Sequence, residues 1–297
     1  MDFIKNDVSN DRLEPEPSVL YVVGTPIGNL EDISIRAKSI LSTVSVIACE
    51  DTRRSGLLLK RIGTSTPLLS FHKHNAKSKI PKILELLKSK KSLALISDAG
   101  IPGISDPGEE LVSAVRKKGF EVICIPGACA ATTALVASGL PCKRFCFEGF
   151  PPNKTKERKE FLELVSKEER TIVIFESPHR LLQLLEELSK FCGEDRPLHL
   201  CRELTKRFEQ HIGNTIGQVL KYYENRKPQG EFTLVLGGHT KEELNKRSDS
   251  ELLNEMQGLI KEGYSPSESV RLTSKNNDLS RRGLYELLHK VSKNDIK

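Results

Sequence analysis

Short apolar runs alternate with helix-length amphipathic segments from residue 19 onward, and this alternation restricts the possible folds more than any other feature of the sequence. Five runs rich in Val, Ile and Leu, each ending in Gly, Pro, Asp or Asn, lie at 19–26, 44–51, 68–75, 92–100 and 121–127. In the segments between them, such as 80–90 and 108–119, apolar residues recur every three or four positions, as in helices. Strands that alternate with helices predict an α/β fold with a mostly parallel sheet, covered on both faces.

A second sheet of similar size is predicted by five further apolar runs, at 145–150, 171–177, 197–204, 208–214 and 231–238. Helices and hairpin-like pairs are mixed here, and the runs 208–214 and 231–238 could pair antiparallel across the segment between them. A chain of 297 residues also exceeds one ordinary domain of roughly 100 to 200 residues. We therefore expect four parts: an acidic, mobile tail (1–17), an N-terminal α/β domain (18–128), a C-terminal α/β domain (129–240), and a linker with a helical extension (241–297).

The helical extension has the signals of three short helices. Ser265, Pro266 and Glu268 stand in the order of an N-cap, a first helical residue and the acidic partner of a capping box. With a helix before this box and another after it, the segment is similar to a helix-turn-helix. Arg281 and Arg282 would open the last helix, where a recognition helix contacts nucleic acid. A three-helix packing or partner-docking module fits the same pattern.

The charged residues are distributed unevenly along the chain. The formal net charge is +6, but residues 18–240 carry +8 because the N-terminal tail is net negative. Such an excess suits an anionic partner such as RNA, and it also suits solubility alone. No apolar stretch approaches the ~18 residues of a membrane helix, and the N-terminus has no apolar signal core, so we expect a cytoplasmic protein without a membrane partner.

Cysteine and histidine give no pattern of a metal centre. The seven cysteines are an odd number for a closed disulfide framework, and none forms a CxxC pair. Most have apolar neighbours, which is typical of small buried residues kept reduced. His72 and His74 alternate on a predicted strand and so face one side, but no third ligand accompanies them. We therefore expect no metal site.

In open α/β sheets, ligands bind beside the carboxyl ends of the strands, so we expect a ligand site in the loops that follow the strands. The loop 24–30 departs from the dinucleotide motif GxGxxG, because Pro26 stands at the second glycine and has no amide hydrogen. This disfavours a nicotinamide site. A rigid loop over a ligand without a phosphate remains open, as does a simple strand-to-helix turn.

The second loop crowds two acids and two arginines into a helix start. Asp51 is a natural N-cap, and capping with a surface ion pair is one complete explanation. In the functional alternative, Arg53 or Arg54 clamps an RNA phosphate while Glu50 or Asp51 positions a hydroxyl.

The fourth loop, 97–108, combines three glycines, two prolines and two aspartates, which favours a rigid ligand wall over a flexible linker. Small residues in 125–130 leave space for a ligand at the domain junction. In 176–180, Ser177 would cap a helix that begins at Pro178, and His179 with Arg180 could hold an anion there.

Ten blocks of the sequence, in order, resemble one known family, that of ribosomal RNA small subunit methyltransferase I, a branch of the tetrapyrrole methylase fold family and of the class III S-adenosylmethionine methyltransferases. The blocks are YVVGTPIGNLEDIS, IACEDTRRSGLLL, FHKHN, SDAGIPGISDPG, PGACAATTAL, ASGLP, FEGFPP, ESPHRL, RELTKRFE and GEFTLVLGG. The resemblance covers about residues 18–240, and the C-terminal segment is similar to the helix-turn-helix extension of many members.

The resemblance implies two α/β domains with S-adenosylmethionine bound in the cleft between them, a homodimer, and 2′-O-methylation of a cytidine ribose in 16S rRNA of the small ribosomal subunit. By motif, the residues implied to line the cofactor are Pro26, Asp98, Ala99, Gly100, Ile101, Pro102, Gly103, Ile104, Gly127, Ala128, Cys129, Ala130 and the strand 230–236. Cys129 and Ala130 stand where tetrapyrrole enzymes often have Ser or Thr.

A ribose hydroxyl is a poor nucleophile while it is protonated, so a residue must accept or orient its proton. Asp51 and His72 are the favoured acceptors, with Glu50 and Asp98 as further candidates. The residues expected to contact the substrate are Arg53, Arg54, His74, His179 and Arg180. Two alternatives stay open: a methyltransferase for tetrapyrrole or corrin precursors, and a catalytically silent RNA-binding or nucleotide-sensing protein.

Overall fold

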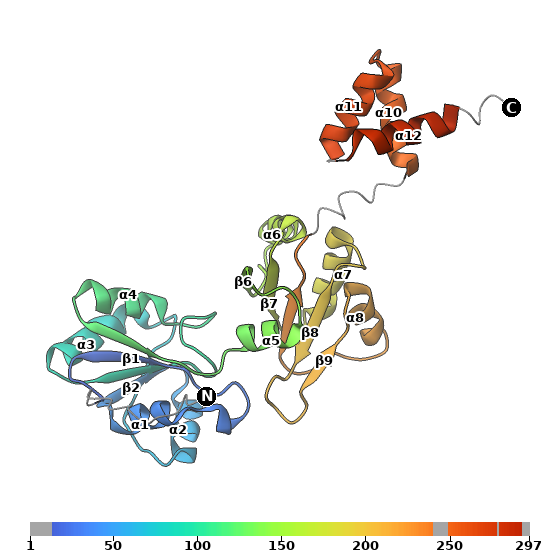
Figure 1. The fold of residues 1–297 in the computed structure, drawn as a ribbon. Helices are drawn as coiled ribbons and strands as arrows, with labels where there is room; N and C mark the ends of the chain where they lie inside the picture. Colours follow the sequence, from blue (N-terminus) through green and yellow to red (C-terminus); the bar gives the residue numbers. More distant parts are fainter. Residues whose placement is uncertain (1–13, 240–248, 278, 293–297) are drawn as a thin grey trace, which may run out of the picture. The chain divides into compact units, whose positions relative to one another are not determined.

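The computed structural model describes residues 14–239, 249–277 and 279–292. Most of the expected tail 1–17 and most of the expected linker after residue 240 lie outside these residues. Contacts divide the chain into a larger unit, which holds two sheets and ends at Gly237, and a smaller unit, which holds the last three helices (Figure 1). Each unit is described by itself.

The first sheet is wholly parallel, as the alternating pattern predicts, with the strand order β3-β2-β4-β1-β5. Its strands are β1 (Val19–Val23), β2 (Val46–Cys49), β3 (Leu68–Ser70), β4 (Leu93–Ile96) and β5 (Glu121–Ile125). The central strands β1 and β4 are buried at every residue, because helices cover both faces of a parallel sheet.

Helices on the two sides of the first sheet bury alternate residues of β1. Helices α1 (Ile35–Thr43) and α2 (Thr52–Arg61) cover one face, and α3 (Ala76–Lys88) and α4 (Glu109–Lys117) cover the other (Figure 1). Tyr21 joins the cluster formed with α1 and α2, and Leu20 joins the cluster formed with α3 and α4. The 3-10 turn η1 (Leu30–Asp32) precedes α1. Ser34 caps α1 by accepting a hydrogen bond from the amide of Ala37, 3.0 Å away.

The second sheet is mixed, with the order β6-β7-β10-β8-β9 and a single parallel pair, β6 with β7. Its strands are β6 (Phe145–Gly149), β7 (Thr171–Glu176), β8 (Leu198–Arg202), β9 (Gln210–Ile212) and β10 (Phe232–Leu236). Helix α5 (Ala130–Ser138) packs on one face through Ala134 and Leu135. On the other face, α6 (Thr155–Lys167), α7 (Leu181–Cys192) and α8 (Ile216–Tyr223) form the larger cluster.

The expected antiparallel pairing of 208–214 with 231–238 is wrong, because β9 pairs with β8 at the edge of the sheet. The reason lies in burial: β10 is buried at all five residues and takes the centre between β7 and β8, whereas only Ile212 of β9 is buried. A short strand with exposed polar residues is suited to an edge.

The smaller unit consists of α10 (Asp249–Lys261), α11 (Pro266–Asn277) and α12 (Arg281–Ser292), around a core of Leu252, Met256, Val270 and Leu284. The predicted capping box is confirmed: the amide of Glu268 donates to the Ser265 hydroxyl (3.2 Å), and the Glu268 carboxylate accepts from the amide of Ser265 (3.1 Å). Helix α12 opens with Arg281, as expected. Among the described residues, no helix combines the length and the apolar character that a membrane crossing requires.

Candidate functional site

The loop after β4 is attached to the end of β1 by two backbone hydrogen bonds. The amide of Thr25 donates to the Gly100 carbonyl (2.9 Å), and the amide of Gly100 donates to the Thr25 carbonyl (3.1 Å). Gly100 and Gly103 have φ values of +81° and +87°, a backbone conformation that residues with a Cβ adopt only at a cost in free energy. The glycines therefore let the loop fold back onto the end of β1, where these two hydrogen bonds hold it.

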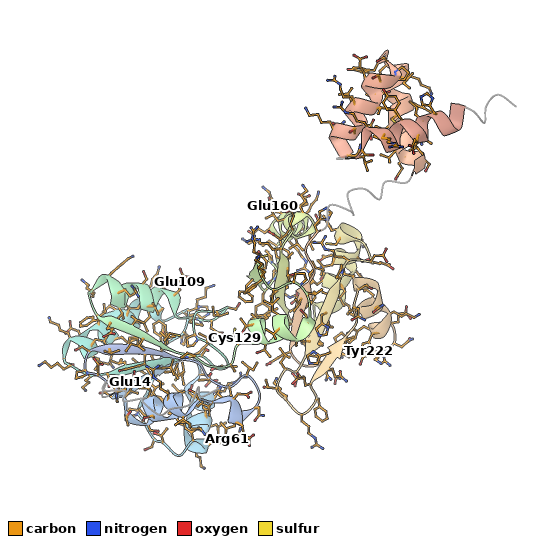
Figure 2. The ribbon with its side chains drawn as sticks, in the orientation of Figure 1. Glu14, Arg61, Glu109, Cys129, Glu160 and Tyr222 are labelled. Atoms are coloured by element: carbon orange, nitrogen blue, oxygen red, sulfur yellow. The ribbon has the colours of Figure 1, made fainter. Side chains whose placement is uncertain are left out.

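The ends of β1 and β5 approach each other unusually closely at two glycines. A Cβ added to Gly24 would lie 2.8 Å from the Cα of Gly127, and a Cβ added to Gly127 would lie 2.8 Å from the backbone of Gly24. The amide of Gly24 also donates to the Ile125 carbonyl (3.1 Å). The two glycines thus permit close packing of the strand ends, and the chain continues from Gly127 to Cys129, the N-cap residue of α5 (Figure 2).

A cavity of about 370 Å³ lies against these loops within the larger unit. Of the residues predicted to line a cofactor, six line it: Ala99, Gly100, Ile101, Ile104, Cys129 and Ala130. The other six predicted residues are not in its wall: Pro26, Asp98, Pro102, Gly103, Gly127 and Ala128. Ile27, the neighbour of Pro26, is in the wall, so the first loop still contributes to the cavity.

The second sheet and the segments next to its strands supply a further part of the wall. Gly230 and Glu231, just before β10, and Phe232 and Thr233, at its start, lie within the segment 230–236 implied by the resemblance. Phe150, Phe175 and Glu176 were not named as site residues from the sequence, although all three lie towards the ends of the predicted runs 145–150 and 171–177. That position at strand ends is the signal that could have identified them.

Glu176 is the most unusual group of the wall, because its carboxylate is fully buried. One oxygen, Oε1, accepts from the amide of Ser177 (2.7 Å) and from Nε of Arg180 (2.8 Å). The other oxygen, Oε2, is buried and has no hydrogen-bond partner among the described residues. A buried acceptor is seldom left unsatisfied, so Oε2 is a ready acceptor for a donor group of a ligand in the cavity.

The predicted helix cap at Ser177 is wrong. Helix α7 begins at Leu181, and Arg180 occupies the N-cap position without a side-chain cap bond. The Arg180 guanidinium is engaged within the protein: it pairs with Glu176 (2.7 Å) and bonds to the Asn153 side chain and the Pro151 carbonyl. Its observed role is to hold Glu176, whereas the neighbouring His179 is exposed.

Three acids meet at the carboxyl ends of β2 and β4. Burial, and then the charge of Glu50, raise the pKa of Asp106 to about 6, with a further contribution from Asp98. Burial, and then Asp98, also raise the pKa of Glu50. A second hollow of about 390 Å³ is lined by Glu50, Lys73, Ser105 and Asp106, among others. Ser105 and Asp106 line both cavities, so Asp106 can reach groups in either one.

Asp51 is the N-cap residue of α2, as the capping explanation of this loop predicts. Its carboxylate accepts from the amide of Arg53 (2.8 Å) and pairs with the Arg53 guanidinium (2.9 Å), and these bonds lower its pKa to about 2. A carboxylate with so low a pKa is a weak base. Arg54 lies 3.3 Å from Asp98, and the side chains of Arg53 and Arg54 remain 89% and 72% exposed, so both keep donors free for a phosphate.

The two histidines of the third loop lie together but differ in exposure. His72 is half-buried, and its Nδ1 is buried without a hydrogen-bond partner in the part of the chain that the structure describes. A charge on His72 would act on Glu50. His74 is exposed, with its ring centroid 6.0 Å from that of His72. The structure thus brings Glu50, His72 and Asp98 to one region at the strand ends.

The chain is similar to known methyltransferases in sequence. The model of the tetrapyrrole (corrin/porphyrin) methylase family matches residues 19–220. A ribosomal RNA small subunit methyltransferase I from Synechocystis sp. is 44% identical over 269 residues, which cover 91% of this chain and 96% of the relative. The protein of that name from Bacillus subtilis is 40% identical over 275 residues (91% and 94%), and that from Escherichia coli O157:H7 is 46% identical over 227 residues (75% and 79%). These matches confirm the predicted family.

Solved structures agree on the fold. A uroporphyrin-III-C-methyltransferase from Thermus thermophilus superposes with a TM-score of 0.53 at 20% identity, over 73% of this chain and 94% of that chain. A cobalt precorrin-4 methyltransferase superposes with a TM-score of 0.55 at 15% identity, over 74% and 95%. At such low identity these likenesses show the fold alone, and they confirm the predicted class III methyltransferase architecture.

Proposed function

Because the chain belongs to the tetrapyrrole methylase family, in the branch of ribosomal RNA small subunit methyltransferase I, we propose that it methylates the 2′-hydroxyl of a cytidine ribose in 16S rRNA with S-adenosylmethionine. The observation that carries the proposal is the pair of adjoining cavities with Asp106 in the wall of both. One cavity suits the methyl donor, and the other suits the acceptor nucleotide.

The first cavity fits S-adenosylmethionine in size and chemistry. Its volume lies within the roughly 300–1,000 Å³ of small-molecule sites. Ile101, Phe150 and Phe175 offer apolar surface to an adenine ring, and the unpartnered Oε2 of Glu176 offers an acceptor for an amino or hydroxyl group. When bound, the cofactor supplies a methyl group activated by its sulfonium. A negative Asp106 in the same wall favours a cationic ligand.

The residues of the second cavity then have two tasks: to orient the ribose hydroxyl and to take its proton. We assign proton acceptance to Asp106, because a pKa of about 6 leaves the carboxylate ionised at neutral pH and yet basic enough to hold a proton. Glu50, which lines only the second cavity, orients the hydroxyl. The paired Asp51 is the weaker acceptor, and His72 acts through its position beside Glu50.

Binding of rRNA would use the exposed guanidiniums of Arg53 and Arg54, which lie on the first turn of α2 near the second cavity's Glu50. The net positive charge of residues 18–240 supports an anionic substrate. Such a substrate would place the protein in the cytoplasm with the small ribosomal subunit. We carry over the homodimer of the family as part of the proposal, and light scattering of the purified chain tests it.

The decisive assay incubates the chain with S-adenosylmethionine carrying a labelled methyl group, and with either 30S subunits or uroporphyrinogen. We expect label in 16S rRNA, in a dinucleotide that survives alkali, because alkaline cleavage of RNA needs a free 2′-hydroxyl. Label in a mononucleotide would place the methyl on a base. Label in the pigment would establish the tetrapyrrole alternative, and no label in either substrate would favour a silent RNA-binding protein.

Two variants separate the roles of the cavities. Glu50→Gln should reduce turnover at least tenfold while leaving the Kd for S-adenosylmethionine unchanged, since Glu50 is absent from the first cavity. Glu176→Gln should weaken cofactor binding, because the amide retains only one acceptor oxygen. Glu85→Gln, an exposed change on α3, is the matched control. Unchanged turnover in Glu50→Gln would contradict the assignment of the second cavity.

A further inference from the structure

Strand pairing at the edge of the second sheet brings three metal-ligating side chains together. His199 and Cys201 are two residues apart on β8 and so share one face of the sheet. His211 on β9 is the direct ladder partner of Cys201. Cys201 is buried, His199 is half-buried and His211 is exposed, so the cluster opens to solvent on one side. It is separate from the cavity that we assign to the cofactor.

Two of the three spacings between the ligand atoms are close to those of a tetrahedral zinc site. The Nε2 atom of His199 lies 3.0 Å from Nδ1 of His211, and Sγ of Cys201 lies 3.6 Å from the same Nδ1. All three atoms lie within 4.8 Å of one another. Zinc bonds of ~2.05 Å to nitrogen and ~2.3 Å to sulfur, at a tetrahedral angle, require about 3.3 Å between two nitrogens and about 3.6 Å between nitrogen and sulfur.

A neighbouring carboxylate orients one of the ligands. Oε1 of Glu209 lies 2.9 Å from Nε2 of His211, so that nitrogen can donate its hydrogen to the carboxylate and leave the lone pair of Nδ1 directed at the cluster. Histidines that bind metals in proteins almost always have such a partner on the other ring nitrogen. A simple hydrogen bond between two histidine rings does not require it.

We propose that His199, Cys201 and His211 bind one zinc ion, with the fourth position open to solvent and with Glu209 positioning His211. Two imidazoles and one thiolate form a donor set that suits zinc among the divalent ions. The ion would displace the thiol proton of Cys201 on binding, as at other thiolate sites.

The location of the cluster indicates what the ion would do. The edge strand β9 has three residues, of which only Ile212 is buried, so little apolar burial supports its pairing with β8. The connection between β8 and β9 contacts the loop 24–30 that follows β1: the Thr205 hydroxyl accepts a hydrogen bond from the amide of Asn29 (3.1 Å). An ion that ties β8 to β9 would hold this connection in place.

Zinc binding to the full-length chain, first stripped with a chelator, tests the proposal. Titration against a chromophoric chelator should give one zinc ion per chain. His211→Gln should weaken the affinity at least ~100-fold, and Glu209→Gln about 10-fold, because loss of an orienting partner costs less than loss of a ligand. His289→Gln, an exposed histidine of the smaller unit, should leave the affinity unchanged.

Cobalt(II) supplies a readout that identifies the thiolate. The cobalt-loaded chain should show tetrahedral visible bands and a sulfur-to-cobalt charge-transfer band in the near ultraviolet. Cys201→Ala should abolish the charge-transfer band, and Cys146→Ala, on β6 of the same sheet, should retain it. Should Cys201→Ala fail to fold, the exposed variant His211→Gln decides alone. Absence of stoichiometric zinc, or zinc affinity that His211→Gln does not change, would overturn the proposal, whatever the outcome of the rRNA assay.

Discussion

Replacing Asp106 by asparagine should make the protein more stable and less active. The carboxylate has a pKa of about 6 in the folded chain, against 3.8 when unperturbed, and its burial is the main cause. The folded state therefore keeps a proton between about pH 4 and 6 that the unfolded chain loses, so stability falls as the pH rises through this window. Above it, the folded chain carries a charge that burial disfavours.

The magnitude follows from the shift. A rise of this size corresponds to at most about 3 kcal/mol, and because the side chain keeps partial contact with water we expect about 1–2 kcal/mol. Asp106→Asn has nearly the same shape, keeps an oxygen that can accept from Ser97, and removes the buried charge. Its free energy of unfolding at pH 7.5 should exceed that of the parent chain by that amount, and the gain should vanish below pH 4.

Urea unfolding, followed by circular dichroism at pH 7.5 and pH 4, measures the difference as a shift of the midpoint. Asp32→Asn, an exposed change in the same unit, should shift stability by less than about 0.5 kcal/mol. An Asp106→Asn midpoint that equals that of the parent chain at pH 7.5, or a gain that is just as large at pH 4, would refute the reasoning.

The same carboxylate should control the rate. Because Asp106 is the assigned proton acceptor and must be ionised to act, we expect kcat/KM to fall about tenfold per pH unit below pH 6. After burial, the charge of Glu50 contributes most to the raised pKa of Asp106, and Glu50→Gln removes this charge. The fall of kcat/KM at acid pH should therefore begin at a lower pH in this variant than in the parent chain. A fall that begins at the same pH in both proteins would assign it to another group.

Further predictions concern packing and the substrate. Glu187→Ala leaves the guanidinium of Arg158, 6% exposed and 2.7 Å from the lost carboxylate, without its partner, and should cost roughly 3 kcal/mol in urea unfolding. Gly127→Ala places a methyl group against Gly24, so it should lower stability by about 1–3 kcal/mol and weaken cofactor binding. The control Gly258→Ala, at an open position within a helix, should leave stability unchanged or raise it, as measured by calorimetry. Binding of rRNA should weaken steeply with salt in filter-binding assays, and a flat response would favour a tetrapyrrole substrate.

Local pattern was enough to predict most elements. The run 19–26 contains β1, the run 92–100 contains β4, and the capping box at Ser265 begins α11 as expected, because these features depend on residues close together in the chain. Pairing between distant runs was less predictable. The runs that contain β9 and β10 were expected to pair with each other, whereas β10 lies between β7 and β8 and β9 pairs with β8. The choice of strand partner depends on residues that are far apart in the chain.

The candidate site divides in the same way. The glycines and prolines of 97–108 identify a ligand wall, because their backbone preferences are intrinsic to each residue. The raised pKa of Asp106 had no such local signal, since it depends on burial and on Glu50, more than fifty positions earlier. The unpartnered oxygen of Glu176 also had no local signal in the sequence, and the same is true of the pairing that brings Cys201 and His211 together across two strands.

The amino-acid sequence by itself determined the two α/β sheets, the loops at their strand ends, the helical extension and the family. Backbone propensity and apolar periodicity depend on a few neighbouring residues, and sequence motifs extend over continuous blocks. All three can therefore be identified from the sequence alone. Only the tertiary structure decided which acids share a desolvated region and which side chains converge on one point. Electrostatic and coordination chemistry depend on distances of a few ångströms in space, and these distances arise only when the sheets have formed.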